Sequence, residues 1–206
     1  SQHFFDFMNA TGLNVCMINK YGEKIGGFVP QNNRRNIKME LKQLHVYDDE
    51  QERLKIARKL EIASISNIRA NLRYYGRRKA SEELREVVTQ ISTMIKELNE
   101  ARDITQLMMI EARARQKYYS CFNYILENKK FRFEKRTRRP PRDPLNAMIS
   151  FGNTLLYQKI ANEINRTSLD IRIGIVHAAG SRPESLNLDL ADLFKSIIVD
   201  RTIFTL

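Results

Sequence analysis

The sequence predicts a mainly α-helical protein in which a small N-terminal β hairpin precedes a larger all-helical domain. Short β-like runs are concentrated in the first 30 residues, whereas apolar residues recur at helical spacing beyond residue 48. The 206 residues, 42% of them hydrophobic, are enough to build a hydrophobic core. We therefore expect the end of a β-rich domain at 1–30, a linker at 31–47 and a helical domain at 48–206.

The N-terminal segment contains a helix end and a hairpin. Residues 1–10 are typical of the end of a helix, which stops at Gly12. Residues 14–19 and 25–29 are the two predicted strands, separated by a polar turn with a glycine. The pair Gly26-Gly27 either weakens the second strand or marks a β-bulge.

Capping signals define the longer helices. Ser81 precedes acidic residues that suit the first turn of a helix, and Asp143-Pro144 places a cap before a proline at the first helical position. The predicted helices cover residues 49–79, 81–99, 103–127 and 143–165, and a last one contains the apolar residues from 186 to 198. The fourth helix is apolar on nearly every side, so we expect it to be central in the bundle.

The charge balance favours a polyanionic partner. The 35 Lys and Arg residues outnumber the 24 Asp and Glu residues, which gives a net charge of +11. Nucleic acid is the first candidate and an anionic membrane the second. Because no apolar run approaches the ~18 residues that span a bilayer, and no signal peptide is visible, we expect a cytoplasmic protein without membrane insertion. Cys16 and Cys121 form no disulfide or metal pattern, which suits a reducing compartment.

Two basic segments, 69–79 and 129–142, contain interleaved aromatic residues. This combination favours contact with a phosphate backbone, although exposed Lys and Arg residues also form ordinary solvated surfaces. No recognition-helix motif is present, so the contacts should be to phosphate and shape rather than to base edges. The predicted DNA-binding residues are Arg69, Arg73, Arg77, Arg78, Arg138, Arg139 and Arg142.

The last 36 residues contain a candidate metal site. His177 follows a β-like run at 171–175, and Asp189 and Asp192 lie in the last predicted helix. At 100° per residue both carboxylates should face away from that helix's own packing surface. Imidazole and carboxylate together suit a divalent transition ion. The alternative is a charged outer face next to a surface histidine.

Glu111 is anomalous because it falls, with Arg115, inside the apolar stripe of the third helix. A carboxylate amid buried surface needs a charge partner or a metal. One interpretation is an ion pair with Arg115 at i, i+4, which would contribute ~0.3–0.5 kcal/mol if exposed. The other is that Glu111 projects into a cleft and is a third ligand beside His177 and Asp192.

Three sequence islands occur in an order that resembles a known family. They are Met-Ile-Glu-Ala-Arg-Ala-Arg at 109–115 with two tyrosines at 118–119, Arg-Arg-Pro-Pro-Arg-Asp-Pro-Leu-Asn-Ala at 138–147, and the segments 173–177 and 185–201. This pattern over residues 104–204 resembles the CRISPR-associated integrase, the first of the Cas proteins. The hairpin at 14–29 is similar to the end of that family's N-terminal β domain.

The resemblance implies a prokaryotic enzyme of antiviral adaptation that forms a homodimer and joins a small second adaptation protein to insert double-stranded spacer DNA into a CRISPR array. It implies that Glu111, His177 and Asp192 bind the metal and that Asp189 supports this catalytic site. The cofactor would be Mn²⁺ or Mg²⁺, and an imidazole ligand favours Mn²⁺.

Two positions depart from the family pattern. Ala112 stands where glycine is common, and Ser196 stands where proline often follows Phe-Lys. Both changes leave the expected site chemistry intact. The chain also opens inside an apolar segment and stops within a predicted helix, so we expect a piece of a longer protein.

The residue types support the implied chemistry. A divalent ion held by two carboxylates and one imidazole can polarise a phosphodiester and lower the pKa of a hydroxyl nucleophile. Attack by a 3′-OH gives strand transfer, and attack by water gives a cut. Two other classes stay open: a metal-dependent nuclease without integration, and a non-catalytic helical DNA-binding or scaffold protein in which Glu111 pairs with Arg115 far from His177.

Overall fold

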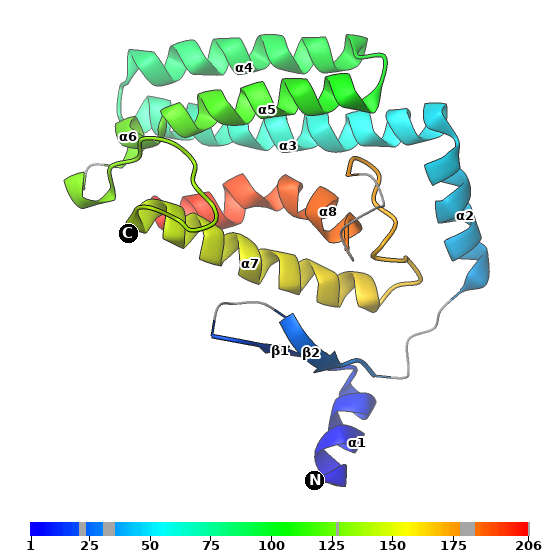
Figure 1. Ribbon diagram of the computed structural model, residues 1–206. Coiled ribbons are helices and arrows are strands. Elements are labelled where there is room, and N and C mark those ends of the chain that lie inside the picture. The colour runs from blue at the N-terminus through cyan, green and yellow to red at the C-terminus, as the bar shows by residue number, and fades with distance from the viewer. Residues whose placement is uncertain (21–23, 31–35, 127, 178–183, 206) are drawn as a thin grey trace.

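The computed structural model describes residues 1–20, 24–30, 36–126, 128–177 and 184–205. Figure 1 shows α3 (Glu50–Arg78), α4 (Glu82–Glu100) and α5 (Ile104–Ser120) in one layer, with α7 (Pro144–Asn165) and α8 (Leu186–Phe194) in a second layer beneath it. The hairpin and the first helix lie beyond α7. The predicted fold class, a hairpin followed by a larger helical domain, is confirmed.

The N-terminal elements match their prediction closely. Helix α1 (Gln2–Thr11) ends at Gly12, whose φ of 68° is the left-handed conformation that favours glycine. Strands β1 (Val15–Ile18) and β2 (Lys24–Phe28) are antiparallel, and their register shifts between Met17 and Ile18. This irregularity is opposite Gly26, so the bulge interpretation holds. The predicted turn at 21–23 lies outside the described residues.

The linker expected at 31–47 is helical over most of its length. Helix α2 (Ile37–Asp48) is capped by Asn36, whose side chain accepts a hydrogen bond from the backbone N–H of Lys38. The helix has no wide apolar stripe, and its one buried residue is the polar Gln43. The Gln43 amide donates to the carbonyls of Asp170 and Ile173, so a long-range contact, invisible in the local pattern, holds this segment.

Four helices begin within one residue of their predicted starts, two of which were predicted from caps. Asp49, Ser81, Asp103 and Asp143 each accept hydrogen bonds from backbone N–H groups of the following turn, at the start of α3, α4, α5 and α7. The buried apolar faces of these helices form one core, which includes Ile65, Leu72, Leu84, Ile91, Leu98, Leu107, Phe122, Leu145 and Ile149. No helix in the described part of the chain is long and apolar enough to cross a membrane.

The third helix is shorter than predicted. Helix α5 ends at Ser120, and the single turn α6 (Phe122–Ile125) follows after Cys121. Beyond it, the short helix η1 (Lys129–Phe131) leads into a loop that returns Phe133 to the core, with its ring centroid 5.6 Å from that of Tyr119. The Asn123 side chain bonds the backbone of Phe133 at 2.6 and 2.8 Å. The chain leaves the helix axis so that this aromatic contact can form.

Helix α7 is less central than its composition suggested. It packs on α8 and on the π-helix η2 (Lys195–Asp200), which continues into α9 (Arg201–Ile203). A Cβ at Gly152 would lie 2.6 Å from Val199 Cγ1, so α7 and η2 approach closely at that glycine. Phe151 and Leu155, on another side of α7, are 62% and 45% exposed. One side of this helix is therefore uncovered.

Candidate active site

Helix α8 holds both predicted aspartates in buried positions. Asp189 is 3% exposed and Asp192 is 9% exposed, so neither carboxylate faces open solvent and both meet surface that another part of the chain supplies. Helix α3 covers them, because Ser64 and Asn67 donate to the backbone carbonyls of Asp192 and Leu193 at 3.0 and 2.8 Å. The face opposite the apolar stripe of α8 thus meets a second, polar packing surface, which the helix's own periodicity could not reveal.

The Asp189 carboxylate organises the segment before α8. It accepts the backbone N–H groups of Ile175, Val176 and His177, the last two at 3.0 Å. The β-like run at 171–175 therefore forms no strand, since these donors bond a buried carboxylate instead. A Cβ at Gly174 would lie 2.6 Å from the His177 carbonyl oxygen, so the tight path of this segment requires glycine.

The same carboxylate orients the His177 ring. Nδ1 of His177 lies 2.6 Å from Oδ1 of Asp189, and the imidazole is 31% exposed. With Nδ1 engaged, Nε2 is the nitrogen that remains for a ligand. A carboxylate that holds one imidazole nitrogen while the other faces a metal is a recurrent arrangement in metal sites.

Arg115 joins Glu111 to Asp192. Its Nε contacts Glu111 Oε1, and its Nη2 lies 3.2 Å from Asp192 Oδ2. Lys195 contacts the other oxygen of Asp192 and lies over the Tyr157 ring, 4.8 Å from its centroid. The Glu111–Arg115 pair expected from sequence is therefore present, but it is also part of a network that reaches α8.

The electrostatics of Asp192 tie His177 to this network. Burial alone would raise the pKa of the Asp192 carboxyl, but the charges of Arg115 and Lys195, with a smaller effect of His177, hold it below its usual range. Asp192 is therefore linked to Glu111 through Arg115, and to His177 through this weaker electrostatic effect.

Glu61 is the acidic residue that the sequence interpretation missed. It lies in α3, is 4% exposed, and its pKa is raised to about 7, first by burial and then by the negative charge of Asp192. Its position in the apolar stripe of α3, in register with Leu54 and Ile65, was the available signal. Glu111 was predicted as a site residue from this kind of signal, an acidic residue within the apolar stripe of a helix.

The donor set suits a divalent cation, although it does not form a closed ligand shell. Within the described ranges, no three His, Cys, Asp or Glu side chains converge closely enough to hold a metal ion as they stand. Glu111 and Asp192 nevertheless share one cationic group, the Arg115 guanidinium, and His177 contributes to the lowered pKa of Asp192. Two carboxylates and a free imidazole nitrogen are the ligand types that Mn²⁺ accepts.

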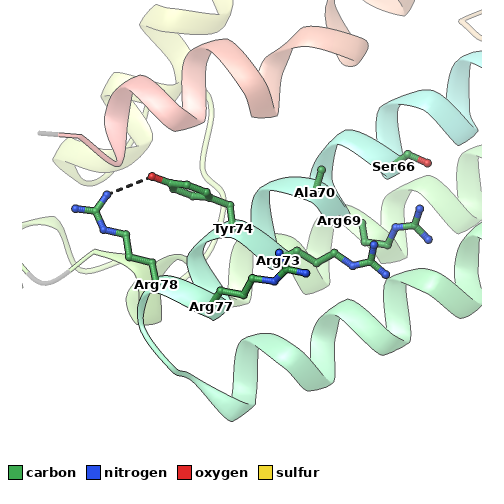
Figure 2. Close-up of a pocket in the computed structure, with 7 residues that line it drawn as sticks. All are labelled: Ser66, Arg69, Ala70, Arg73, Tyr74, Arg77 and Arg78. Carbon is green, nitrogen blue, oxygen red and sulfur yellow. Dashed lines mark hydrogen bonds between the residues drawn. The ribbon is translucent and has the colours of Figure 1, made fainter.

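The predicted DNA-binding residues separate into two groups. Arg69, Arg73, Arg77 and Arg78 line a groove of about 780 Å³ along α3, together with Ser66, Ala70 and Tyr74 (Figure 2). Arg138, Arg139 and Arg142 are exposed on the loop before α7. Arg136 in that loop turns inward, donating to the side chains of Asn146 and Ser150 at 2.8 and 3.0 Å.

The family model described as CRISPR associated protein Cas1 matches residues 1–206. The chain belongs to the Cas1 family. The CRISPR-associated endonuclease Cas1 2 of Thermodesulfovibrio yellowstonii is 39% identical over 206 residues, which are 100% of this chain and 62% of that Cas1 protein. The resemblance read from the three islands is confirmed.

Two solved structures share the fold. A Cas1 protein from Thermotoga maritima superposes with a TM-score of 0.84 at 35% identity, over 100% of this chain and 63% of its own. A casposase bound to integration product gives 0.85 at 22% identity, over 100% of this chain and 56% of its own, which is a similarity of fold alone. The chain thus spans about three fifths of the length of these Cas1 relatives.

Proposed function

We propose that this chain supplies the catalytic site of a metal-dependent DNA endonuclease and strand-transfer integrase that inserts spacer DNA into a CRISPR array. The observation that carries the proposal is the network in which Arg115 contacts both Glu111 and Asp192, while Asp189 holds the His177 ring and His177 contributes to the lowered pKa of Asp192. A scaffold protein would need no such meeting of carboxylates from α5 and α8. Membership of a family whose relatives are named endonucleases supports the same reading.

Each residue has a distinct role in this proposal. Glu111, Asp192 and Nε2 of His177 would hold the ion, which is Mn²⁺ or Mg²⁺ and which, when bound, polarises the scissile phosphodiester and lowers the pKa of the attacking hydroxyl. Asp189 holds His177 through Nδ1 and so positions Nε2. Lys195 contacts the Asp192 carboxylate and can offset negative charge on an incoming phosphate.

The partners follow from the same reading. The net charge of +11 supports double-stranded DNA as the substrate. Membership of the family supports a homodimer and a small second adaptation protein. A cytoplasmic location in a prokaryotic cell belongs to the same proposal.

A two-product assay tests the function. The chain is incubated with Mn²⁺, a labelled DNA with a free 3′-OH and a target duplex, with and without the second adaptation protein. We expect joined product, and its loss in Glu111→Ala, His177→Ala and Asp192→Ala but not in Glu100→Ala, which removes an exposed carboxylate from the end of α4.

The products separate the alternatives. Cleavage without joining, with the partner present, would indicate a plain nuclease. Full activity in any of the three site variants would refute the ligand assignment. Circular dichroism and thermal melting of each variant exclude loss by unfolding.

A further inference from the structure

Helix α3 presents two different surfaces to its surroundings. One side of the helix donates hydrogen bonds to backbone carbonyls of α8 and η2, through Ser64, Asn67 and Asn71. Glu61 is also buried, and after burial itself the charge of Asp192 raises its pKa. At 100° per residue, Arg69, Arg73 and Arg77 lie about 80°, 120° and 160° around the helix from Glu61, turning away from Ser64. These three arginines of the groove therefore lie on the side of α3 that faces away from the candidate active site.

This outer side is cationic along most of the helix. Lys55 and Lys59 share the side with Arg69, Arg73 and Arg77, and the row spans about 33 Å at 1.5 Å per residue. Between residues 55 and 78 the only acid is Glu61, which is buried on the inner side. Among the described residues, none of the three row arginines makes an ion pair. Their charges are therefore uncompensated by the protein fold.

The spacing of the row suits a repeated anion. Arg73 and Arg77 are one i, i+4 step apart, which is about 6 Å along the helix. This is of the same order as the separation of neighbouring phosphates on one nucleic-acid strand. Guanidinium groups bind phosphate oxygens through two parallel hydrogen bonds, so arginine in such a row can hold successive phosphates. The small side chains of Ser66 and Ala70 keep the groove open between them.

An aromatic side chain closes one end of the groove. Tyr74 is 46% exposed, and its hydroxyl accepts a hydrogen bond from Arg78 at 3.3 Å (Figure 2). Arg201 lies 5.3 Å from the centroid of the Tyr74 ring. Tyrosine flanked by arginine gives a surface on which a base can stack. A protein ligand with an acidic face would use the charges but has no need of this ring.

We propose that the outer side of α3 is a second nucleic-acid surface, which holds the phosphate backbone of one DNA strand away from the candidate active site. The inference rests on the proposed function in so far as DNA is the substrate, but it requires neither metal nor catalysis. It assigns to these arginines the retention of a DNA segment that is not the one being cut or joined. A duplex and a single strand offer the same phosphate chemistry, so the test includes both.

The experiment measures binding without metal. Fluorescence anisotropy with a labelled single strand and a labelled duplex, in EDTA, compares the unmodified chain with Arg73→Gln/Arg77→Gln. We expect the dissociation constant to rise roughly tenfold or more for at least one probe, and the slope of log affinity against log salt to fall in magnitude by about 2. The probe with the larger loss identifies the strand form.

Two controls make the result decisive. Arg102→Gln/Lys117→Gln removes the same number of exposed charges near α4 and α5 and should keep both affinity and salt slope. Asp192→Ala should keep DNA binding while losing strand transfer, so failure of this proposal is distinguishable from failure of the catalytic one. Equal affinities and slopes for the arginine pair and its control would overturn the inference, and would leave an acidic protein as the occupant of the groove.

Discussion

Asp189 and His177 are joined directly in the candidate active site, with 2.6 Å between Oδ1 and Nδ1. The carboxylate lies in the first turn of α8, and the imidazole lies at the end of an irregular segment whose N–H groups bond the same carboxylate. One buried aspartate thus determines both the path of residues 174–177 and the direction of the ring.

Replacing Asp189 by Asn should weaken metal binding without removing a ligand. The amide cannot accept hydrogen bonds at both of its terminal atoms, so one group of contacts to residues 175–177 is lost and the His177 ring is released. We expect Mn²⁺ affinity to fall by about 10–100-fold, as for other partners of ligating histidines. Electron paramagnetic resonance of Mn²⁺ measures it directly. An unchanged affinity would show that His177 is positioned by other groups.

Replacing Arg115 by Gln should destabilise the metal-free protein. The change leaves the carboxylates of Glu111 and Asp192 buried without their shared cation, which costs roughly 3–5 kcal/mol of unfolding free energy. Added Mn²⁺ should restore more stability to this variant than to the unmodified chain, because it would replace the missing charge. Thermal unfolding with and without Mn²⁺ tests both statements.

Arg113→Gln is the matched control for that comparison. Arg113 contacts Glu97 on the exposed side of α5, so its loss should change stability by less than ~1 kcal/mol. If Mn²⁺ stabilises the Arg113 and Arg115 variants equally, the ion does not bind among these carboxylates.

Glu61→Gln should make the free energy of unfolding fall less as the pH rises. Burial raises the pKa of the folded Glu61 carboxyl from 4.5 to about 7, so the folded state binds a proton that the unfolded state has released between these values. Stability contributed by this proton is complete below pH 4.5 and is lost as the pH rises through 7, by on the order of 3 kcal/mol. We would measure the free energy of unfolding by urea in EDTA at pH 5.5 and pH 8. The stability of the variant relative to the unmodified chain should be greater at pH 8 than at pH 5.5. A constant difference would contradict the raised pKa.

Gly174→Ala should disturb the histidine segment. The new Cβ would meet the His177 carbonyl oxygen at 2.6 Å and the Ser185 side chain at 2.9 Å, so the backbone must shift. We expect a loss of roughly 1–3 kcal/mol and weaker Mn²⁺ binding. Gly76→Ala in α3 is the control, because its Cβ would lie 3.4 Å from Leu84 and a helical Ala is favoured by ~0.5–1 kcal/mol. Similar destabilisation by both changes would refute the special role of Gly174.

Local signals in the sequence specify the order and the starts of the main helices. Caps such as Ser81 and Asp143 act on backbone groups within three residues of themselves. Their effect is local, so it can be predicted from the neighbouring residues. The same is true of Gly12, which ends α1 through its own backbone conformation. The candidate ligands were named from the family pattern, together with the anomaly of a glutamate in an apolar stripe.

The contacts of these side chains depend on the packing of helices that are distant in the sequence. The burial of Asp192 depends on α3 and α5, which are remote in sequence, and no periodicity within α8 contains that information. The bridging position of Arg115, the raised pKa of Glu61 and the placement of the arginine groove on the outer side of α3 have the same origin. The packing of the helices in three dimensions determines which side chains on different helices form ion pairs and hydrogen bonds. Capping and amphipathic spacing depend only on the order of residues along the chain.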